Sequence, residues 1–286
     1  MLDYDLERLS YTQSEIAIHA LEEALEVVTE NQRLDLRDDY SPDPPLFWPS
    51  NLLYIDANVG GFYGMTTIAA EKGTGKTLIA TASAISAAAT RRWQVCHFLA
   101  EDDYDGFRER FNLFLSTHPE AHSCFDHFHP VAVGKGQTPK TLVAEVKRLI
   151  EPGSNAPILI VLDSINSIVN LSGGPYLQGL SDMGLWAMFA RKISRGRASF
   201  LINSETNKRG ESKGESLPSW SDVYLKMKKC SESVVEMRLD KTRRTKGEGD
   251  MGKYVRRWDA QEFEKAPMIV ERPKLRAVGS DDWSLS

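Results

Sequence analysis

The chain has 286 residues, of which 41% are hydrophobic and 26% charged, and its formal net charge is −5. That length is enough for one large α/β domain with an extension or for two small domains, and the composition is typical of a soluble globular protein. No apolar run approaches the ~20 residues of a membrane-spanning helix, so we expect no membrane partner. An acidic N-terminus without a signal-peptide pattern, and three scattered cysteines, favour a cytoplasmic protein.

The small net charge hides an uneven distribution along the chain. Residues 1–60 contain 13 acidic and 3 basic residues, whereas residues 191–257 contain 18 basic and 9 acidic residues. A uniformly acidic protein would bind nucleic acid poorly, but a segregated basic half leaves such binding open. An ordinary solvated surface explains the same pattern, so charge alone does not decide the class of partner.

Residues 1–50 are expected to form a helical N-terminal appendage that ends in a proline-rich linker. Thr12 and Glu15 have the spacing of a helix-capping box, and the apolar residues that follow recur with helical periodicity. The apolar face of this helix could pack on the chain's own core or on a neighbouring subunit. The prolines within residues 41–45 then predict an extended, semi-rigid connection.

From residue 51 the pattern predicts an α/β domain that extends to residue 262, followed by a C-terminal tail over residues 263–286. Apolar strands alternate with helices, which implies a parallel sheet covered by helices on both faces. The expected strands are 65–70, 95–100, 125–132, 158–163 and 198–203, and the expected helices are 76–90, 104–117, 138–150 and 180–195. Shorter strands at 222–229, 233–240 and 252–258, with a Gly-rich turn, predict an antiparallel C-terminal extension.

The segment from Ala70 to Thr77 predicts a phosphate-binding P-loop, because it joins an apolar strand to an alanine-rich helix and ends in Gly-Lys-Thr. Backbone N–H groups of such a loop face a bound anion, and the helix N-terminus adds partial positive charge. Lys76 would reach the β- and γ-phosphates of ATP, and Thr77 would ligate Mg²⁺. Ala70 stands where the pattern normally begins with glycine. The predicted nucleotide-binding residues are Glu71, Lys72, Gly73, Thr74, Gly75, Lys76, Thr77 and Leu78.

Two carboxylates follow predicted strands at the edge where α/β folds bind ligands. Asp163 ends the apolar run 158–163, and in a P-loop protein this is the Walker B position, which holds Mg²⁺ directly or through water. Glu101 is the first acidic residue after the strand 95–100, and we predict that it orients the attacking water. The next two residues, both aspartates, are assigned to capping the following helix.

A glutamate after the second strand, together with an aspartate ending the Walker B strand, resembles the arrangement of RecA-type and DnaB-like P-loop ATPases. The string Phe98–Asp102 is similar to the same strand end in small plasmid-encoded hexameric replicative helicases of the RepA kind. The Walker B strand and the strand Ser199–Ser204 also match that family. The resemblance implies a RecA-like core and assigns the sensing of the γ-phosphate to Asn203 or Ser204.

The stretch Lys241-Thr242-Arg243 has the Lys-x-Arg pattern that RecA- and DnaB-like ATPases project into a neighbour's active site. The resemblance implies that Arg243, assisted by Lys241, acts as an arginine finger, with Arg244 as a competing candidate. A cation supplied in this way neutralises charge on the transferring phosphoryl group and is worth ~10³–10⁵ in rate. Such head-to-tail contacts build rings or filaments. The alternative is a basic hairpin rim without a catalytic role.

Two loops, at residues 166–179 and 206–214, correspond to those that line the central channel of RecA-like rings. An aromatic residue in the first could stack on a base, and basic residues in the second could contact phosphates. Glutamates in and beside the second loop weaken its positive field. The residues assigned to nucleic-acid contact are Tyr176, Lys208, Arg209 and Lys213.

A cluster of potential metal ligands lies between the second helix and the third strand. It consists of His118, His122, Cys124, His127 and His129. The spacing matches no zinc-binding pattern, so a connection rich in partly exposed histidines is the preferred interpretation.

The sequence as a whole predicts an Mg²⁺-dependent ATPase that forms a homo-oligomeric ring, hexameric by resemblance, and translocates on single-stranded DNA as a helicase. Other replication proteins are further candidate partners. One alternative is a RecA-type recombinase or strand-annealing protein, in which ATP controls DNA affinity without unwinding. The other is a KaiC-like regulatory ATPase that has protein partners and does not bind DNA.

Overall fold

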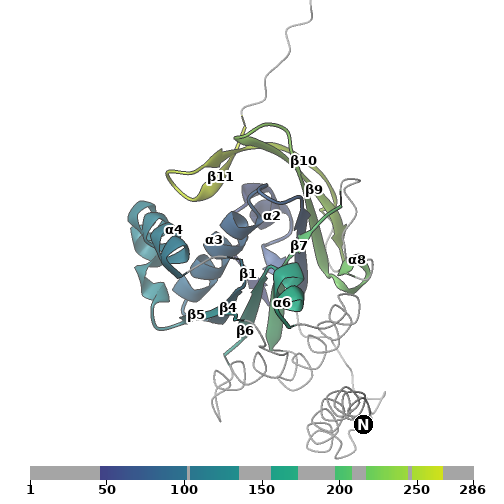
Figure 1. The fold of residues 1–286 in the computed structure, drawn as a ribbon. Coiled ribbons are helices and arrows are strands. Elements are labelled where there is room, and N and C mark those ends of the chain that lie inside the picture. Colours follow the sequence, from purple (N-terminus) through teal and green to yellow (C-terminus); the bar gives the residue numbers. More distant parts are fainter. Residues whose placement is uncertain are drawn as a thin grey trace, which may run out of the picture.

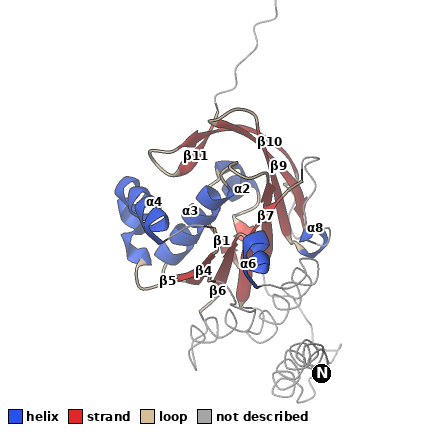
Figure 2. Ribbon diagram, in the orientation of Figure 1, coloured by secondary structure: helices blue, strands red, loops and turns tan. Residues whose placement is uncertain are grey.

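A nine-stranded mixed sheet with helices on both faces forms the frame of the protein (Figure 1, Figure 2). The computed structural model describes residues 46–101, 104–134, 156–172, 197–207, 217–243 and 247–266. The strand order is β11-β10-β9-β8-β3-β7-β6-β4-β5. The strands are β3 (Met65–Ala70), β4 (Gln94–Leu99), β5 (Phe128–Ala132), β6 (Ile158–Asp163), β7 (Ala198–Glu205), β8 (Val223–Lys229), β9 (Val234–Thr242), β10 (Gly249–Arg257) and β11 (Glu262–Lys265).

The predicted parallel sheet is confirmed, because β8, β3, β7, β6, β4 and β5 are parallel neighbours. Every residue of β6 is buried, as expected for a strand that is covered on both sides. Side chains of a strand alternate between the two faces. Leu159 and Val161 therefore join one apolar cluster, and Ile158, Ile160 and Leu162 join another on the opposite face.

Helices cover both of these clusters. α3 (Lys76–Ala89) and α4 (Tyr104–Thr117) pack on the Leu159 face, and α6 (Ile165–Ser172) and α8 (Leu217–Trp220) pack on the other. The helices predicted at 76–90 and 104–117 are thus confirmed, whereas those at 138–150 and 180–195, and the N-terminal appendage, lie outside the described residues. The remaining elements are α2 (Leu53–Asn58), the 3₁₀-helix η1 (Pro119–Cys124) and a small sheet of β1 (Phe47–Trp48) and β2 (Phe62–Tyr63). In the described part of the chain, every helix is too short or too polar to span a membrane.

The predicted antiparallel extension is confirmed for β9, β10 and β11. β8 has two roles, since it pairs parallel with β3 and antiparallel with β9. β11 was not predicted, and it continues the sheet to Lys265, past the domain boundary expected at residue 262. Likewise, β5 begins at Phe128 and not at residue 125, because the histidine-rich connection forms η1 first.

The extension does not continue the plane of the core sheet. Irregular registers occur at Tyr224/Leu225 and at Asp250/Gly252, and such bulges bend a strand and increase its twist. As a result β10 and β11 curve over α2 and α3 (Figure 1), and β11 contacts α3. This curvature brings the end of the extension to the start of α3, where the predicted P-loop lies.

Candidate nucleotide-binding site

The predicted P-loop connects the buried strand β3 to α3. Gly75 is the residue before the first turn of α3 and has a left-handed φ of 104°, and Gly73 has a φ of 75°. A Cβ on Gly75 would lie 2.7 Å from Cζ of Phe263, whereas one on Gly73 would meet no atom within 4 Å. Ala70, in the position usually taken by glycine, ends β3 opposite Glu205 in an ordinary strand pair. Because that backbone is extended, the Cβ of Ala70 is accommodated.

Lys76 lies folded back across this loop. Its Nζ donates hydrogen bonds to the carbonyl oxygens of Ala70, at 3.0 Å, and of Glu71, at 3.1 Å. The hydroxyl of Thr74 donates to the same Glu71 carbonyl at 2.8 Å. Glu71, Lys72 and Gly73 are exposed, while Thr74 and Leu78 are buried. The ammonium is therefore held at the mouth of the loop, where a phosphate oxygen would compete with neutral carbonyls for its protons.

Asp163 connects three elements of the core at the carboxyl edge of the sheet. It is 3% exposed, and its Oδ1 accepts a hydrogen bond of 3.1 Å from the Thr77 hydroxyl on α3. The same oxygen accepts a hydrogen bond of 2.7 Å from the Asn203 amide on β7. The predicted sensor Asn203 is therefore in direct contact with the predicted metal-binding carboxylate.

The predicted ligands suit Mg²⁺. This cation prefers oxygen donors and usually keeps several waters while it binds one or two protein oxygens and substrate phosphates. The Thr77 hydroxyl and the Asp163 carboxylate supply such donors beside the P-loop. These two residues would hold the ion, and bound Mg²⁺ would neutralise charge on the phosphate oxygens.

Glu101 follows β4, next to the end of β6, because the Ala100 N–H donates to the Asp163 carbonyl at 2.9 Å. Two serines from the beginning of α6 hold its carboxylate. The hydroxyl of Ser167 donates to Oε1 at 2.8 Å, and the fully buried Ser164 donates to the same oxygen. Sequence analysis missed these serines, because only the fold brings α6 beside the end of β4. An exposed carboxylate fixed in this way can accept a proton from, and orient, a water molecule.

Comparison with known proteins establishes the fold independently of these motifs. No family model matches the chain, and no curated protein matches its sequence. Among solved structures, the ATPase domain of a helicase superposes with a TM-score of 0.62 at 12% identity, over 88% of this chain and 98% of that one. A KaiC-like protein, PH0186 from the hyperthermophilic archaeon Pyrococcus horikoshii OT3, superposes with a TM-score of 0.60 at 16% identity, over 78% and 100%.

The chain has the RecA-like ATPase fold. At these identities the similarity concerns the fold alone, so the roles of residues in this RecA-like chain follow from their own geometry.

The predicted finger lies at the opposite edge of the RecA-like sheet. Thr242 is level with Val223 and, through it, with Thr66 near the start of β3. Arg243 is the next residue, and its N–H donates to the carbonyl of Asp222 at 2.9 Å. The P-loop begins at the other end of β3, about 16 Å away at ~3.3 Å per residue. Arg243 is therefore far from the P-loop of its own chain.

Carbonyl groups and one carboxylate hold the two finger candidates in place. Lys241 donates to the carbonyls of Pro218 and Ser219, at 2.6 and 3.2 Å. Arg243, which is 47% exposed, also donates to Ser219 and lies 3.8 Å from the Asp222 carboxylate. Burial and the charge of Arg243 lower the pKa of Lys241, and Asp222 and Glu248 oppose that shift.

The predicted nucleic-acid contacts are not within the described part of the chain. This applies to Tyr176, Lys208, Arg209 and Lys213, and also to Arg244, the competitor for the finger. Their roles stay predictions.

The C-terminal extension covers the P-loop from outside, which the sequence did not predict. Arg256 of β10 is 5% exposed and donates to the Gly73 carbonyl at 2.9 Å, and burial lowers its pKa. Its guanidinium lies 4.2 Å from the ring centroid of Trp258. Phe263 of β11 packs against Gly75. We call Arg256, Trp258 and Phe263 the strap.

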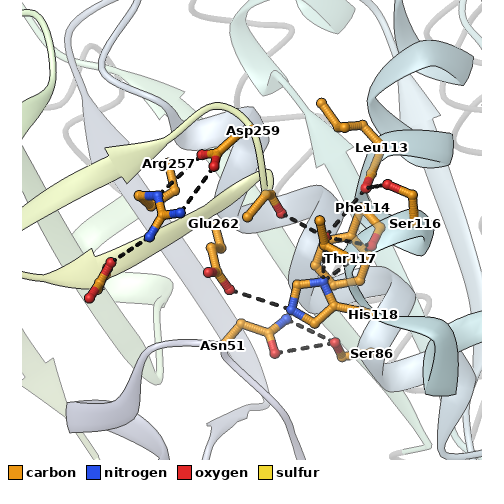
Figure 3. Close-up of polar contacts among 12 residues, drawn as sticks. Asn51, Ser86, Leu113, Phe114, Ser116, Thr117, His118, Arg257, Asp259 and Glu262 are labelled. Carbon is orange, nitrogen blue, oxygen red and sulfur yellow. Dashed lines mark hydrogen bonds and ion pairs between the residues drawn. The ribbon is translucent and has the colours of Figure 1, made fainter.

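The turn between β10 and β11 is held against the end of α4 (Figure 3). The Thr117 hydroxyl donates to the Ala260 carbonyl at 3.4 Å, and the His118 Nε2 lies 3.4 Å from Glu262. Within the turn, Arg257 forms a paired contact with Asp259 at 3.0–3.1 Å. The strap is thus held at both of its ends.

The histidine-rich connection makes local contacts. The Gln94 amide lies between His127 Nδ1, at 2.9 Å, and His129 Nε2, at 3.0 Å. His118 stacks on Phe114 with a centroid distance of 4.2 Å. Within the described residues, no three His, Cys, Asp or Glu side chains gather in a metal-binding group.

Proposed function

We propose that this chain is an Mg²⁺-dependent ATPase of the cytoplasm that works as a homo-oligomeric ring, a hexamer, and moves on single-stranded DNA to open the duplex. One observation carries the proposal. The P-loop, the Walker B aspartate and the water-orienting glutamate meet at one edge of the sheet, while the Lys-x-Arg pair lies at the other edge. The chain thus brings both halves of a hydrolytic site, but not to the same place.

Each residue at the carboxyl edge has a role that follows from its contacts. Lys76 would exchange the carbonyls of Ala70 and Glu71 for phosphate oxygens, since a charge-assisted hydrogen bond is the stronger one. Thr77 and Asp163 would hold Mg²⁺, with Asn203 orienting the carboxylate. Glu101 would orient the water that attacks the γ-phosphate.

The role of Arg243 requires a second subunit. A finger stabilises the transition state only when its guanidinium reaches the transferring phosphoryl group, and Arg243 lies about 16 Å along the strand from its own P-loop. A neighbour placed head to tail would bring the amino edge of one sheet to the carboxyl edge of the next. Heterologous contacts that close produce a ring.

The decisive test is complementation between two inactive variants. Lys76→Ala removes the phosphate-binding amine but keeps the finger, and Arg243→Ala does the reverse. If the finger acts in trans, a mixture of the two forms interfaces with an intact Lys76 and an intact Arg243, and hydrolysis returns. A mixture that stays as inactive as its components would contradict the shared site. Arg238→Ala is the control for Arg243→Ala, since Arg238 is an exposed arginine of β9 paired with Asp240.

The DNA part of the proposal rests on the resemblance of the strand ends to RepA-type helicases, and it needs a separate experiment. We expect single-stranded DNA to stimulate hydrolysis at low salt, and a forked duplex to be unwound. Stimulation without unwinding would favour the recombinase or strand-annealing alternative.

The similarity to a KaiC-like protein supports one further candidate, a regulatory ATPase with protein partners. The net charge of −5 is in line with this alternative. Hydrolysis that is independent of single-stranded DNA at every salt concentration would favour it. The complementation experiment does not separate the two, because both place the active site between subunits.

A further inference from the structure

One polar side chain in the core of the site has no role in the function proposed above. His97 is the fourth residue of β4 and is 0% exposed. Its ring lies between Phe107 of α4 and Phe128 of β5, at centroid distances of 5.5 and 5.9 Å, with both contacts edge-on. An aliphatic or phenyl side chain would fill this position without a polar atom, so the imidazole calls for an explanation.

Neither ring nitrogen of His97 has a hydrogen-bond partner among the described residues. Leaving a buried donor unpaired costs free energy. Burial, together with the nearby charge of Arg110, lowers the pKa of His97 to about 3, so the ring is neutral and carries one N–H. The core therefore contains a neutral imidazole that can donate one hydrogen bond.

The position of the ring indicates where that hydrogen bond would go. His97 Nε2 lies 3.9 Å from Oδ2 of Asp163. The other oxygen of the same carboxylate, Oδ1, already accepts hydrogen bonds from Thr77 and Asn203. The gap at Oδ2 is about 1 Å longer than an N–H···O hydrogen bond. A small rotation of the carboxylate would close it.

We propose that His97 is a positioning residue for Asp163, donating its Nε2–H to Oδ2 when Mg²⁺ and nucleotide bind. This inference rests on the proposed role of Asp163 in holding Mg²⁺. Each carboxylate oxygen would then have a fixed donor, so the carboxylate could not rotate away from the ion. Hydrogen bonds to metal-binding side chains have this effect, and their loss typically weakens metal affinity ~10–100-fold.

The test measures metal-dependent nucleotide binding and does not depend on turnover. A fluorescent ATP analogue is titrated into the full chain, first in EDTA and then at increasing Mg²⁺. For His97→Phe, which keeps an apolar ring between Phe107 and Phe128, we expect unchanged affinity in EDTA. We also expect an Mg²⁺ midpoint raised about tenfold or more. Thermal unfolding of the same samples checks that the variant is folded.

Two further substitutions separate the hydrogen bond from packing. Glutamine puts its amide nitrogen close to the Nε2 position, whereas asparagine puts it close to Nδ1, so His97→Gln should restore most of the Mg²⁺ response and His97→Asn should not. Phe107→Leu disturbs the packing of the ring but keeps its donor, and it should leave the midpoint unchanged.

The outcomes distinguish this inference from the proposed function. If binding by the unsubstituted chain ignores Mg²⁺, the proposed metal site is wrong and the role of His97 fails with it. If that chain responds to Mg²⁺ and folded His97→Phe has the same midpoint, only the role of His97 is overturned. Equal loss in His97→Gln and His97→Phe would also overturn it, since the donor would then be irrelevant.

Discussion

The two edges of the core sheet hold their charged side chains in different states. At the carboxyl edge, Lys76 and Asp163 are 7% and 3% exposed and bind groups of their own chain. At the amino edge, Arg243 is 47% exposed and is held mainly by a backbone carbonyl. Buried charges must be paired within the fold, whereas an exposed guanidinium keeps donors for another molecule. The difference indicates a site that is preorganised in one subunit and completed by the next.

The largest effect should come from removing the exposed half. We expect Arg243→Ala to lower kcat for ATP hydrolysis by ~10³–10⁵, the usual worth of an arginine finger, because the finger places its charge directly on the phosphoryl group. Arg238→Ala, the matched change on the same strand, should have little effect. Steady-state hydrolysis by both variants at saturating ATP provides the measurement.

The same comparison can be broken by dilution. If the site is shared, specific activity should fall as the oligomer dissociates, and a sizing experiment at each concentration should follow the same curve. Constant specific activity in a confirmed monomer would mean that the carboxyl edge is complete by itself.

The next largest effect concerns the water-orienting group. Glu101→Gln keeps the size of the side chain and its contacts with Ser164 and Ser167 but removes the basic oxygen. General-base catalysis contributes ~10²–10⁴, so kcat should fall by that factor. Nucleotide affinity should change little, because the carboxylate does not bind the phosphates. Single-turnover hydrolysis and equilibrium binding measure the two quantities separately, and an equal loss in both would assign Glu101 to binding.

A third prediction sharpens what preorganises the carboxyl edge. Gly75→Ala should destabilise the fold more than Gly73→Ala, although both residues have a left-handed φ. Backbone strain of this kind costs ~1–3 kcal/mol at either position. Only at Gly75 would the new Cβ meet Phe263, at 2.7 Å, so Phe263→Leu should recover part of the difference in the double variant. Chemical denaturation of the four variants tests this, and equal free energies of unfolding for the two glycine variants would rule out a tight contact with the strap.

These contacts mark how far the sequence could predict the site. The P-loop, Asp163 and Glu101 could be identified because each lies within a few residues of a strand end, and a parallel sheet brings such ends to one edge. The strap could not, because the hydrogen bond from Arg256 to Gly73 spans 183 residues and depends on bulges that bend β10. Ser167 and His97 were missed for the same reason, since their partners come from other elements.

Direction within the sheet was also beyond the sequence. β8 has the alternation of any half-buried strand, and alternation is the same in parallel and antiparallel pairs. Its parallel pairing with β3 brings the start of β8, and with it the end of β9 and Arg243, to the amino edge. The prediction of a Lys-x-Arg finger was therefore made without knowing that its position excludes its own P-loop.

The smallest expected effect concerns the link between Glu101 and α6. Ser167→Ala removes one of the two hydroxyl donors to Glu101 Oε1 and leaves Ser164 in place. A single hydrogen bond at an exposed carboxylate is worth about 1 kcal/mol, so we expect kcat to fall about fivefold with KM unchanged. Ser116→Ala on α4, whose hydroxyl donates to the Leu113 carbonyl, is the control. A loss confined to kcat would mean that α6 orients the catalytic carboxylate from the far face of the sheet, whereas an unchanged kcat would leave Ser164 as the main support of Glu101.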